Sequence, residues 1–223
     1  MPKPEKIICV GHNYRDHTKE VGADEPAEPL LFAKFPTTLI GNGEPIVIPI
    51  EATHVDAEAE LAVVIGKTVR RVPRERALDA VAGYVCANDV SARNIQYGEP
   101  QWLRGKSFDR FCPVWPLDDP VPVSVLGDGS GLRVVQRLNG EVMQDGNTSD
   151  LIFDVGYLVA FASNVFTLAP GDLILTGTPA GVGWARDPRL SMKDGDTVEV
   201  EVEGIGVLAN PVVAEGAEAS GRA

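Results

Sequence analysis

The stretch HVDAEAELAVVIG, residues 54–66, constrains the fold more than any other part of the chain. Alternate residues form one wholly apolar series, which is the pattern of one face of a strand: Val55, Ala57, Ala59, Leu61, Val63 and Ile65. The other series begins with polar and charged side chains and ends with apolar ones: His54, Asp56, Glu58, Glu60, Ala62 and Val64. The sequence therefore predicts a strand that carries carboxylates where it enters a core.

Further strand and turn signals surround this stretch. Asn139-Gly140 lies between two alternating segments, which is a strong β-hairpin signal, and residues 197–203 alternate strictly in a second hairpin. Helical patterns are fewer: one is expected to start at Pro73 and end before Gly83, and another lies within residues 149–166. This mixture predicts an α+β fold rather than a doubly wound sheet. The glycine-rich stretches match neither a phosphate loop nor a dinucleotide fingerprint.

The composition is that of a globular protein, with 44% hydrophobic and 23% charged residues in 223. The formal net charge of −12 argues against nucleic acid as a partner, because phosphates would be repelled. No apolar run approaches the roughly 20 residues of a membrane span, and no leader pattern is recognisable, so we expect a cytoplasmic protein. The 3 cysteines are widely spaced and are expected to be buried free thiols. We expect one domain over residues 1–213 and a disordered tail over 214–223.

The acidic residues suggest a cation site. Glu58 and Glu60 would share a strand face with Cα atoms roughly 6.5–7 Å apart, where two buried carboxylates repel unless a cation joins them. Asp89 follows another apolar strand, Tyr84–Ala87. The alternatives are a solvated strand face for the two glutamates and a turn or N-cap role for Asp89. Oxygen ligands without a His or Cys cluster would suit Mg²⁺ or Mn²⁺ rather than Zn²⁺.

Three further stretches carry residues that could take part in catalysis or binding, although each also has an ordinary structural explanation. His17 and Glu20 would share a helix face, where the carboxylate can raise the basicity of the imidazole; they could equally be an exposed pair. Lys106 lies in RGKSFDRFCP and could be a surface lysine. The strand Leu173–Leu175 runs into TGTPAGVG, an ordinary turn or a loop whose backbone N–H groups could hold a carboxylate.

Taken together, six stretches in this order resemble the fumarylacetoacetate hydrolase family. They are IICVGHNYRDH, PLLFAKFPTTLIG, DAEAELAVVIGK, GYVCANDVSARNIQ, GKSFDRFCPV and GDLILTGTPAGVG. The resemblance covers nearly the whole chain and implies a mixed β-roll with flanking helices, assembled as a homodimer. The chain departs from the family pattern at His12, Phe35 and Trp115. Of these, Trp115, together with the acidic lid segment, bears on which substrate tail would fit.

The resemblance also implies roles for individual residues. Glu58, Glu60 and Asp89 would ligate the divalent metal, and Lys106 would meet the substrate or a metal-bound water. His17 and Glu20 would be an acid/base pair on a segment, about residues 14–31, that closes over the substrate. The positions expected to contact or neutralise an anionic substrate are Arg15, Arg93, Gln96 and Thr178.

The implied substrates are small anionic 2-keto or 2-enol acids, which react through a metal-stabilised enolate. Within this class the His17–Glu20 pair favours hydrolysis of the C–C bond of an acylpyruvate, because that reaction needs an activated water. Two alternatives remain open: decarboxylation of oxaloacetate, and isomerisation or decarboxylation of 2-hydroxyhepta-2,4-diene-1,7-dioate. A metal-stabilised binding module is the non-enzymatic alternative.

Overall fold

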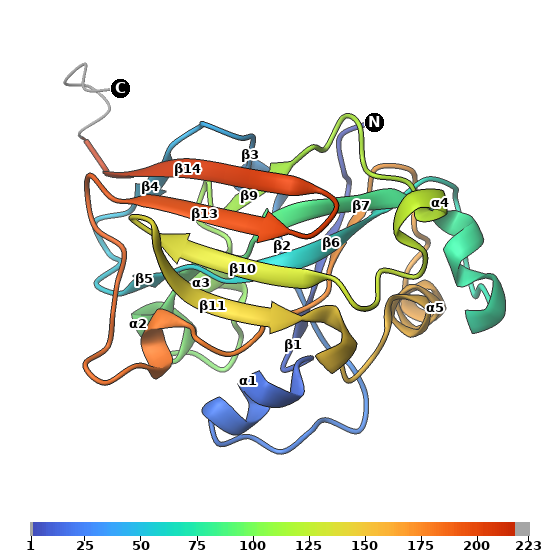
Figure 1. The fold of residues 1–223 in the computed structure, drawn as a ribbon, viewed down its shortest axis with the longest axis horizontal. Coiled ribbons are helices and arrows are strands. Elements are labelled where there is room, and N and C mark those ends of the chain that lie inside the picture. Colours follow the sequence, from blue (N-terminus) through green and yellow to red (C-terminus); the bar gives the residue numbers. More distant parts are fainter. Residues whose placement is uncertain (1, 217–223) are drawn as a thin grey trace.

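The computed structural model describes residues 2–216, and strands dominate this part of the chain (Figure 1). One sheet has seven strands in the order β2 (Leu30–Lys34), β1 (Ile7–Gly11), β12 (Leu173–Leu175), β6 (Ala59–Ile65), β7 (Val81–Asn88), β9 (Cys112–Trp115) and β3 (Leu39–Ile40). A second has the order β11 (Glu141–Asn147), β10 (Arg133–Leu138), β13 (Thr197–Val202), β14 (Gly206–Ala214) and β4 (Ile46–Ile48). A short pair joins β5 (Val55–Asp56) to β8 (Ser91–Ala92). The predicted α+β class is confirmed.

The helices are short and lie around the sheets. They are α1 (Arg15–Glu20), α2 (Arg93–Gln96), α3 (Leu103–Lys106), α4 (Val123–Leu126) and α5 (Val155–Val165), with 3₁₀ turns η1 (Pro36–Thr38), η2 (Arg74–Ala80), η3 (Thr148–Asp150) and η4 (Gly183–Ala185). The helix predicted within 149–166 is α5, and Asp154 caps it by accepting from the Tyr157 N–H at 2.8 Å. Within residues 2–216, no helix is long and apolar enough to cross a membrane.

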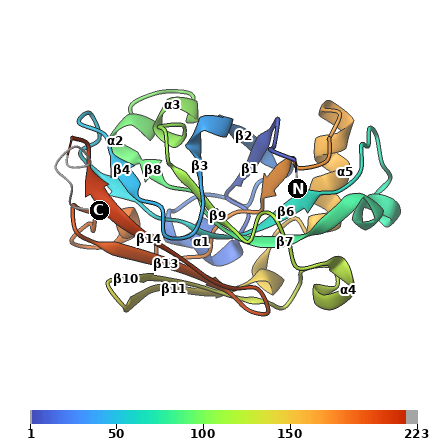
Figure 2. The ribbon, with the colours of Figure 1, turned by 90° about the horizontal axis from the view of Figure 1, so that it is seen from above.

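The two larger sheets pack face to face, and Figure 2 shows the five-stranded sheet as a separate layer beside β6 and β7. The core between them includes Leu61 and Val63 of β6 with Val200 of β13. The other face of β6 carries Ala62 and Val64, which pack with β1, β9 and β12 in a second cluster. A central strand that is buried on both faces explains the change from charged to apolar residues noted in the sequence.

Both predicted hairpins are confirmed. Asn139 and Gly140 join β10 to β11 with φ angles of 52° and 81°, as the favoured two-residue hairpin turn requires. The second hairpin consists of β13 and β14, which pair antiparallel from Thr197 onward. Ala214, the first residue of the predicted tail, ends β14, and residues 217–223 lie outside the described residues.

The continuous strand predicted over residues 54–66 is wrong in one respect, because the chain breaks between β5 and β6. The Ala57 N–H donates to Asp56 Oδ1 at 3.0 Å, and the Glu58 N–H donates to the side-chain Oδ1 of Asn88 at 3.0 Å instead of to a backbone carbonyl. β5 then pairs with β8, and α2 begins after this pair, at Arg93.

The helix predicted after Pro73 begins there, but its type and its end differ from the prediction. It is a single 3₁₀ stretch, η2, and the chain then enters β7 at Val81, which pairs with Ile65. Gly83 therefore does not terminate a helix. A Cβ on Gly83 would lie 2.4 Å from the Val121 carbonyl oxygen, so the glycine permits a close backbone approach. The 3 cysteines are buried and free, as predicted.

Candidate active site

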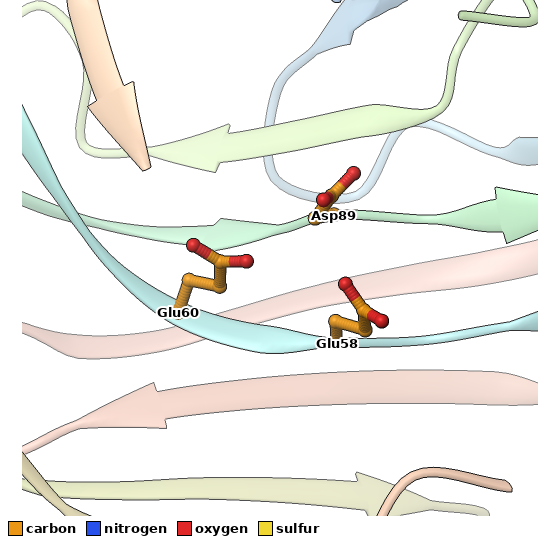
Figure 3. Close-up of side chains that lie close together, drawn as sticks. All are labelled: Glu58, Glu60 and Asp89. Carbon is orange, nitrogen blue, oxygen red and sulfur yellow. The ribbon is translucent and has the colours of Figure 1, made fainter. Parts of the chain in front are cut away.

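The carboxylates of Glu58, Glu60 and Asp89 converge where β6 begins and β7 ends. Ala59 pairs with Asn88 across these antiparallel strands, so the residue before β6 lies beside the residue after β7. The Asp89 N–H donates to the Glu58 carbonyl at 3.0 Å. Figure 3 shows the three side chains pointing into one space, and one oxygen from each lies within 4.8 Å of the others. The structure thus brings the predicted triad together.

Two buried cations share this space. Lys106 Nζ lies 2.7 Å from both Glu58 Oε2 and Asp89 Oδ2, and Arg93 Nη2 lies 2.6 Å from Glu58 Oε1. Burial alone would raise the pKa of Glu58, but the charges of Arg93 and Lys106 hold it below its usual range. We call Glu58, Glu60, Asp89, Arg93 and Lys106 the charged floor.

Glu60 is the member of the charged floor without a cationic partner. It accepts a hydrogen bond from the Gly177 N–H at 2.7 Å, and no lysine or arginine within residues 2–216 forms an ion pair with it. Burial and the charges of Asp89 and Glu58 raise the pKa of Glu60 well above its usual range. A divalent cation among the three carboxylates would supply the charge that this arrangement lacks.

The helix α1 faces the charged floor. His17 Nδ1 lies 3.0 Å from Glu20 Oε2, so the predicted pair is formed, and Glu20 Oε1 accepts from the Gly181 N–H at 2.8 Å. His17 lines the same pocket as the charged floor. Because Nδ1 faces a carboxylate, Nε2 is the nitrogen left for chemistry in the pocket. We call α1 with His17 and Glu20 the helix wall.

The turn that follows β12 binds carboxylates through its backbone, but these carboxylates are the protein's own. Its N–H groups pair Gly177 with Glu60, Gly181 with Glu20, and Gly183 with Asp56. The turn depends on glycine: Gly181 has φ +109°, and a Cβ there would lie 2.2 Å from the Met143 carbonyl oxygen. The turn therefore holds the charged floor and the helix wall in one frame.

Thr178 and Gln96 also line the pocket, as predicted for substrate contacts. Thr178 Oγ1 donates to the Ala59 carbonyl at 2.9 Å and accepts from Gln144 Nε2 at 2.7 Å. Gln96 Oε1 accepts from Arg93 Nη1 at 3.0 Å. Both side chains are thereby fixed in orientation beside the charged floor.

Arg15 is the predicted substrate residue that the structure does not bring to the pocket. Its Nη1 donates to the carbonyls of Asp150 at 3.2 Å and Leu151 at 3.0 Å. Two residues correspond to about 200° around a helix, so Arg15 and His17 project to nearly opposite sides of α1. In this structure Arg15 therefore anchors the helix wall, and its expected role in neutralising substrate stays a prediction.

Sequence reasoning missed the role of Lys34. Its ammonium lies 2.6 Å from Asp89 Oδ1 and 3.0 Å from the Val90 carbonyl, and only 2% of the residue is exposed. The available signal was weak: Lys34 shares a face of β2 with Phe32, which lines the pocket. Its acidic partner lies 55 residues away in the chain.

Sequence reasoning also missed the role of Asp56, which holds the guanidinium of Arg93 in place. Its Oδ2 accepts from Arg93 Nη2 at 2.8 Å and from the Trp184 N–H at 3.0 Å. Aromatic residues close the opposite side of the pocket, where the Trp102 ring lies edge-on to Phe32 at 5.4 Å and to His12 at 5.6 Å. The side chain of His12, one of the atypical positions, thus forms part of the pocket.

Comparison with known proteins shows which family has this arrangement of residues. A family model described as "Fumarylacetoacetate (FAA) hydrolase C-terminal" matches residues 6–213. The chain belongs to the fumarylacetoacetate hydrolase family. The resemblance inferred from the six stretches is confirmed, and the chain is an enzyme of this family. Its acidic triad has the composition of a divalent-metal site.

Relatives of this fumarylacetoacetate hydrolase family member are similar along nearly its whole length. An uncharacterized protein of Archaeoglobus fulgidus is 49% identical over 210 residues, which cover 94% of this chain and 79% of that protein. The "Oxaloacetate tautomerase fahd2, mitochondrial" of Xenopus laevis is 47% identical over 215 residues, covering 96% and 67% of the two chains.

Solved structures give the same picture. The 5-carboxymethyl-2-hydroxymuconate delta-isomerase of Mycobacterium smegmatis matches with a TM-score of 0.84 and 45% identity, covering 96% of this chain and 80% of that one. The 2-hydroxyhepta-2,4-diene-1,7-dioate isomerase of Mycobacterium marinum matches with a TM-score of 0.83 and 44% identity, covering 96% and 76%. The fold assignment therefore rests on both sequence and structure.

Proposed function

We propose that this protein is a divalent-metal-dependent tautomerase or isomerase of 2-keto and 2-enol acids. The observation that carries the proposal is the position of His17, which is held by Glu20 and faces three clustered carboxylates across one pocket. The relatives named as an oxaloacetate tautomerase and as isomerases of unsaturated acids support it. These reactions move a proton and need no attacking water, so they place fewer demands on the site than hydrolysis.

Glu58, Glu60 and Asp89 would hold the metal. Their donor set consists of carboxylate oxygens, which suits Mg²⁺ or Mn²⁺, and Glu60 lacks any other cationic partner within residues 2–216. When bound, such a cation supplies positive charge that favours the enol form of a 2-keto acid.

Charge balance supports an anionic substrate. Four buried carboxylates, on Asp56 and the acidic triad, face the three buried cations Lys34, Arg93 and Lys106. A divalent cation would change the local charge from net negative to net positive, so the pocket would attract an anion although the whole chain carries −12. Gln96 and Thr178, which line the pocket, would orient the substrate's polar oxygens.

His17 would move the proton. Glu20 accepts from Nδ1–H, so Nε2 presents its lone pair and can take a proton from C3 of a 2-keto acid. The electrons of that C–H bond form the C2=C3 double bond of the enol, and Nε2–H returns the proton to the 2-oxygen or, in a conjugated substrate, to a more distant carbon. Glu20 stabilises the imidazolium between these two steps.

Hydrolysis of an acylpyruvate is the second candidate, and the same His17–Glu20 pair favours it. An imidazole held by a carboxylate can activate a water as readily as it can remove a carbon-bound proton. Oxaloacetate decarboxylation would require only the charged floor. Tautomerisation and hydrolysis would therefore both need His17 of the helix wall, whereas decarboxylation would not.

One panel of assays tests the proposal. Purified protein with Mg²⁺ or Mn²⁺ is given enol-oxaloacetate, 2-hydroxyhepta-2,4-diene-1,7-dioate and acetylpyruvate, and ¹H NMR in D₂O follows proton exchange and product formation. We expect tautomerisation or isomerisation to be the fastest reaction and to stop with a chelator. Faster cleavage of acetylpyruvate would replace the proposal with the hydrolase, and no turnover of any substrate would overturn both.

A further inference from the structure

A second hollow adjoins the pocket and shares two lining residues with it, His12 and Tyr97. One side is formed by the end of α1 and the loop after it, including Glu20, and the other by η4 and the residues that follow it, up to Arg189. In Figure 1, α1 and the orange turn η4 lie at the same end of the molecule. A molecule that is bound at the charged floor and is long enough to leave the pocket on this side would pass His12 and Tyr97 and enter the hollow.

The chemical character of the hollow is set by Arg189. Its guanidinium carbon lies 3.7 Å from the centre of the Trp184 ring, a close cation–π contact. Within residues 2–216 it forms no ion pair with any carboxylate. Two acids line the hollow: Glu20, which is engaged by His17 and by the Gly181 N–H, and Asp187, which is exposed.

The platform beneath Arg189 consists of packed aromatic rings. The Trp184 ring is stacked on Tyr97 at 5.4 Å with an interplanar angle of 22°, and His54 lies edge-on to it at 5.4 Å. Stacking fixes the plane of the guanidinium and leaves its N–H edge available, which is the arrangement for bidentate binding of a carboxylate.

Other groups in the hollow would also favour a bound carboxylate. Arg186 donates to the Met143 carbonyl at 2.7 Å and to the Gly181 carbonyl at 3.3 Å, which fixes a second positive charge beside the first. His12 Nδ1 is buried without a hydrogen-bond partner in the described part of the chain, at the junction of the pocket and the hollow. It could bond a polar group in the middle of a bound molecule.

We propose that this hollow is an outer subsite that binds the far carboxylate of a dicarboxylic 2-keto acid through Arg189. The proposal rests on the proposed function, since the near carboxylate and the 2-keto oxygen would lie at the charged floor. It narrows the substrate class to dicarboxylic acids long enough to span both sites.

Binding calorimetry with the Mn²⁺-loaded protein tests the subsite without requiring turnover. The ligands are oxalate, which is long enough only for the inner site, and the matched pair 2-oxoheptanedioate and 2-oxoheptanoate, which differ in the far carboxylate. We expect the wild type to bind 2-oxoheptanedioate about tenfold more tightly than 2-oxoheptanoate, and Arg189→Ala to abolish this difference without weakening oxalate. Arg76→Ala, which removes an equal charge from an exposed site paired with Asp79, should retain the preference.

The possible failures are distinguishable. If the wild type binds oxalate and both longer acids but shows no preference, or if Arg189→Ala keeps the preference, the outer subsite is wrong and the proposed function stands. If Arg189→Ala and Arg76→Ala reduce the preference equally, the effect belongs to overall charge and the subsite is again wrong. If the loaded protein binds none of the three ligands, the proposed function falls and the subsite falls with it.

Discussion

The charged floor and the helix wall hold their functional groups in different ways. Every residue of the charged floor is at most 5% exposed, and four of the five are joined by ion pairs of 2.6–2.7 Å. The helix wall is a helix of 6 residues whose N-cap, Tyr14, makes no side-chain capping bond. It is followed by a mostly exposed loop over residues 21–29.

The two regions meet two different requirements of the proposed reaction, which are cation binding and proton transfer. Holding a cation among three carboxylates requires fixed geometry, because buried charges without partners are costly. Moving a proton requires one correctly oriented imidazole, which a short helix can supply through His17, Glu20 and a single bond to Gly181. Changes in the charged floor should therefore remove metal binding, whereas changes in the helix wall should remove turnover alone.

The largest effect is expected from Glu60→Gln. Removing one of three clustered ligands should abolish Mn²⁺ binding in a calorimetric titration and, with it, all metal-dependent activity. Because Glu60 has no cationic partner within residues 2–216, a neutral side chain of the same shape should not destabilise the metal-free protein in thermal unfolding. Glu141→Gln, at an exposed position of β11, is the matched control. An unchanged Mn²⁺ titration would remove Glu60 from the metal site.

His17→Ala tests the other side of the comparison. Loss of a general base typically costs about 10²–10⁴-fold in rate, so tautomerisation or hydrolysis should fall by that factor while Mn²⁺ affinity stays unchanged. Decarboxylation of oxaloacetate should survive better, because it needs only the charged floor. Lys19→Ala, an exposed change on α1, controls for disturbance of the helix. Equal losses in all three reactions would show that His17 is not the proton-transferring base.

Local patterns in the sequence predicted much of the charged floor. Glu58 and Glu60 were recognisable because side-chain alternation is a property of a few neighbouring residues, and Asp89 because an apolar strand ends just before it. The His17–Glu20 pair followed from helical spacing in the same way. That these groups meet in one pocket was implied only by the family resemblance, since spacing carries no information about contacts between distant strands.

The errors share a physical cause, because each depends on a contact far away in the chain. Lys34 meets Asp89 across 55 positions, and no local pattern marks it. Gly83 suggested a helix end, but it is a glycine because the Val121 carbonyl approaches it. The position of Arg15 depends on distant contacts in the same way: in this structure its guanidinium donates to the carbonyls of Asp150 and Leu151, and its expected contact with substrate stays a prediction.

Glu20→Gln should have a smaller effect than His17→Ala. Glutamine keeps the size of the side chain but removes the charge that orients and stabilises the imidazole, and the loss of such a supporting partner typically costs about 10–100-fold. We expect kcat to fall with little change in KM or in Mn²⁺ affinity. Glu25→Gln, in the exposed loop after α1, is the control. A loss as large as that of His17→Ala would mean that Glu20 itself takes part in the proton transfer.

The smallest expected effect is a change in the mobility of the segment that carries the helix wall. We propose that residues 14–31 act as a lid, and the contacts of the helix wall indicate which part would move. The N-terminal end is anchored, because the Asp16 N–H donates to Asp150 Oδ2 at 2.9 Å and Tyr14 is fully buried. The loop over 21–29 has a backbone bond from Gly22 to Lys19 and one from Ala23 to Thr18, and the side chains of Asp24, Glu25, Ala27 and Glu28 are exposed.

Hydrogen exchange should therefore be fast over residues 21–28 and slow over β6 and β7, which lie in the core. Binding of Mn²⁺ and oxalate should slow exchange in the loop and at the end of α1, while β6 and β7, already protected, should change little. The measurement compares loaded protein with and without oxalate by mass spectrometry. If the loop exchanges equally in both states, the helix wall is as fixed as the charged floor, and the two regions differ only in chemistry. If the loop is protected and β6 is unchanged, the segment that carries His17 also controls access to the metal.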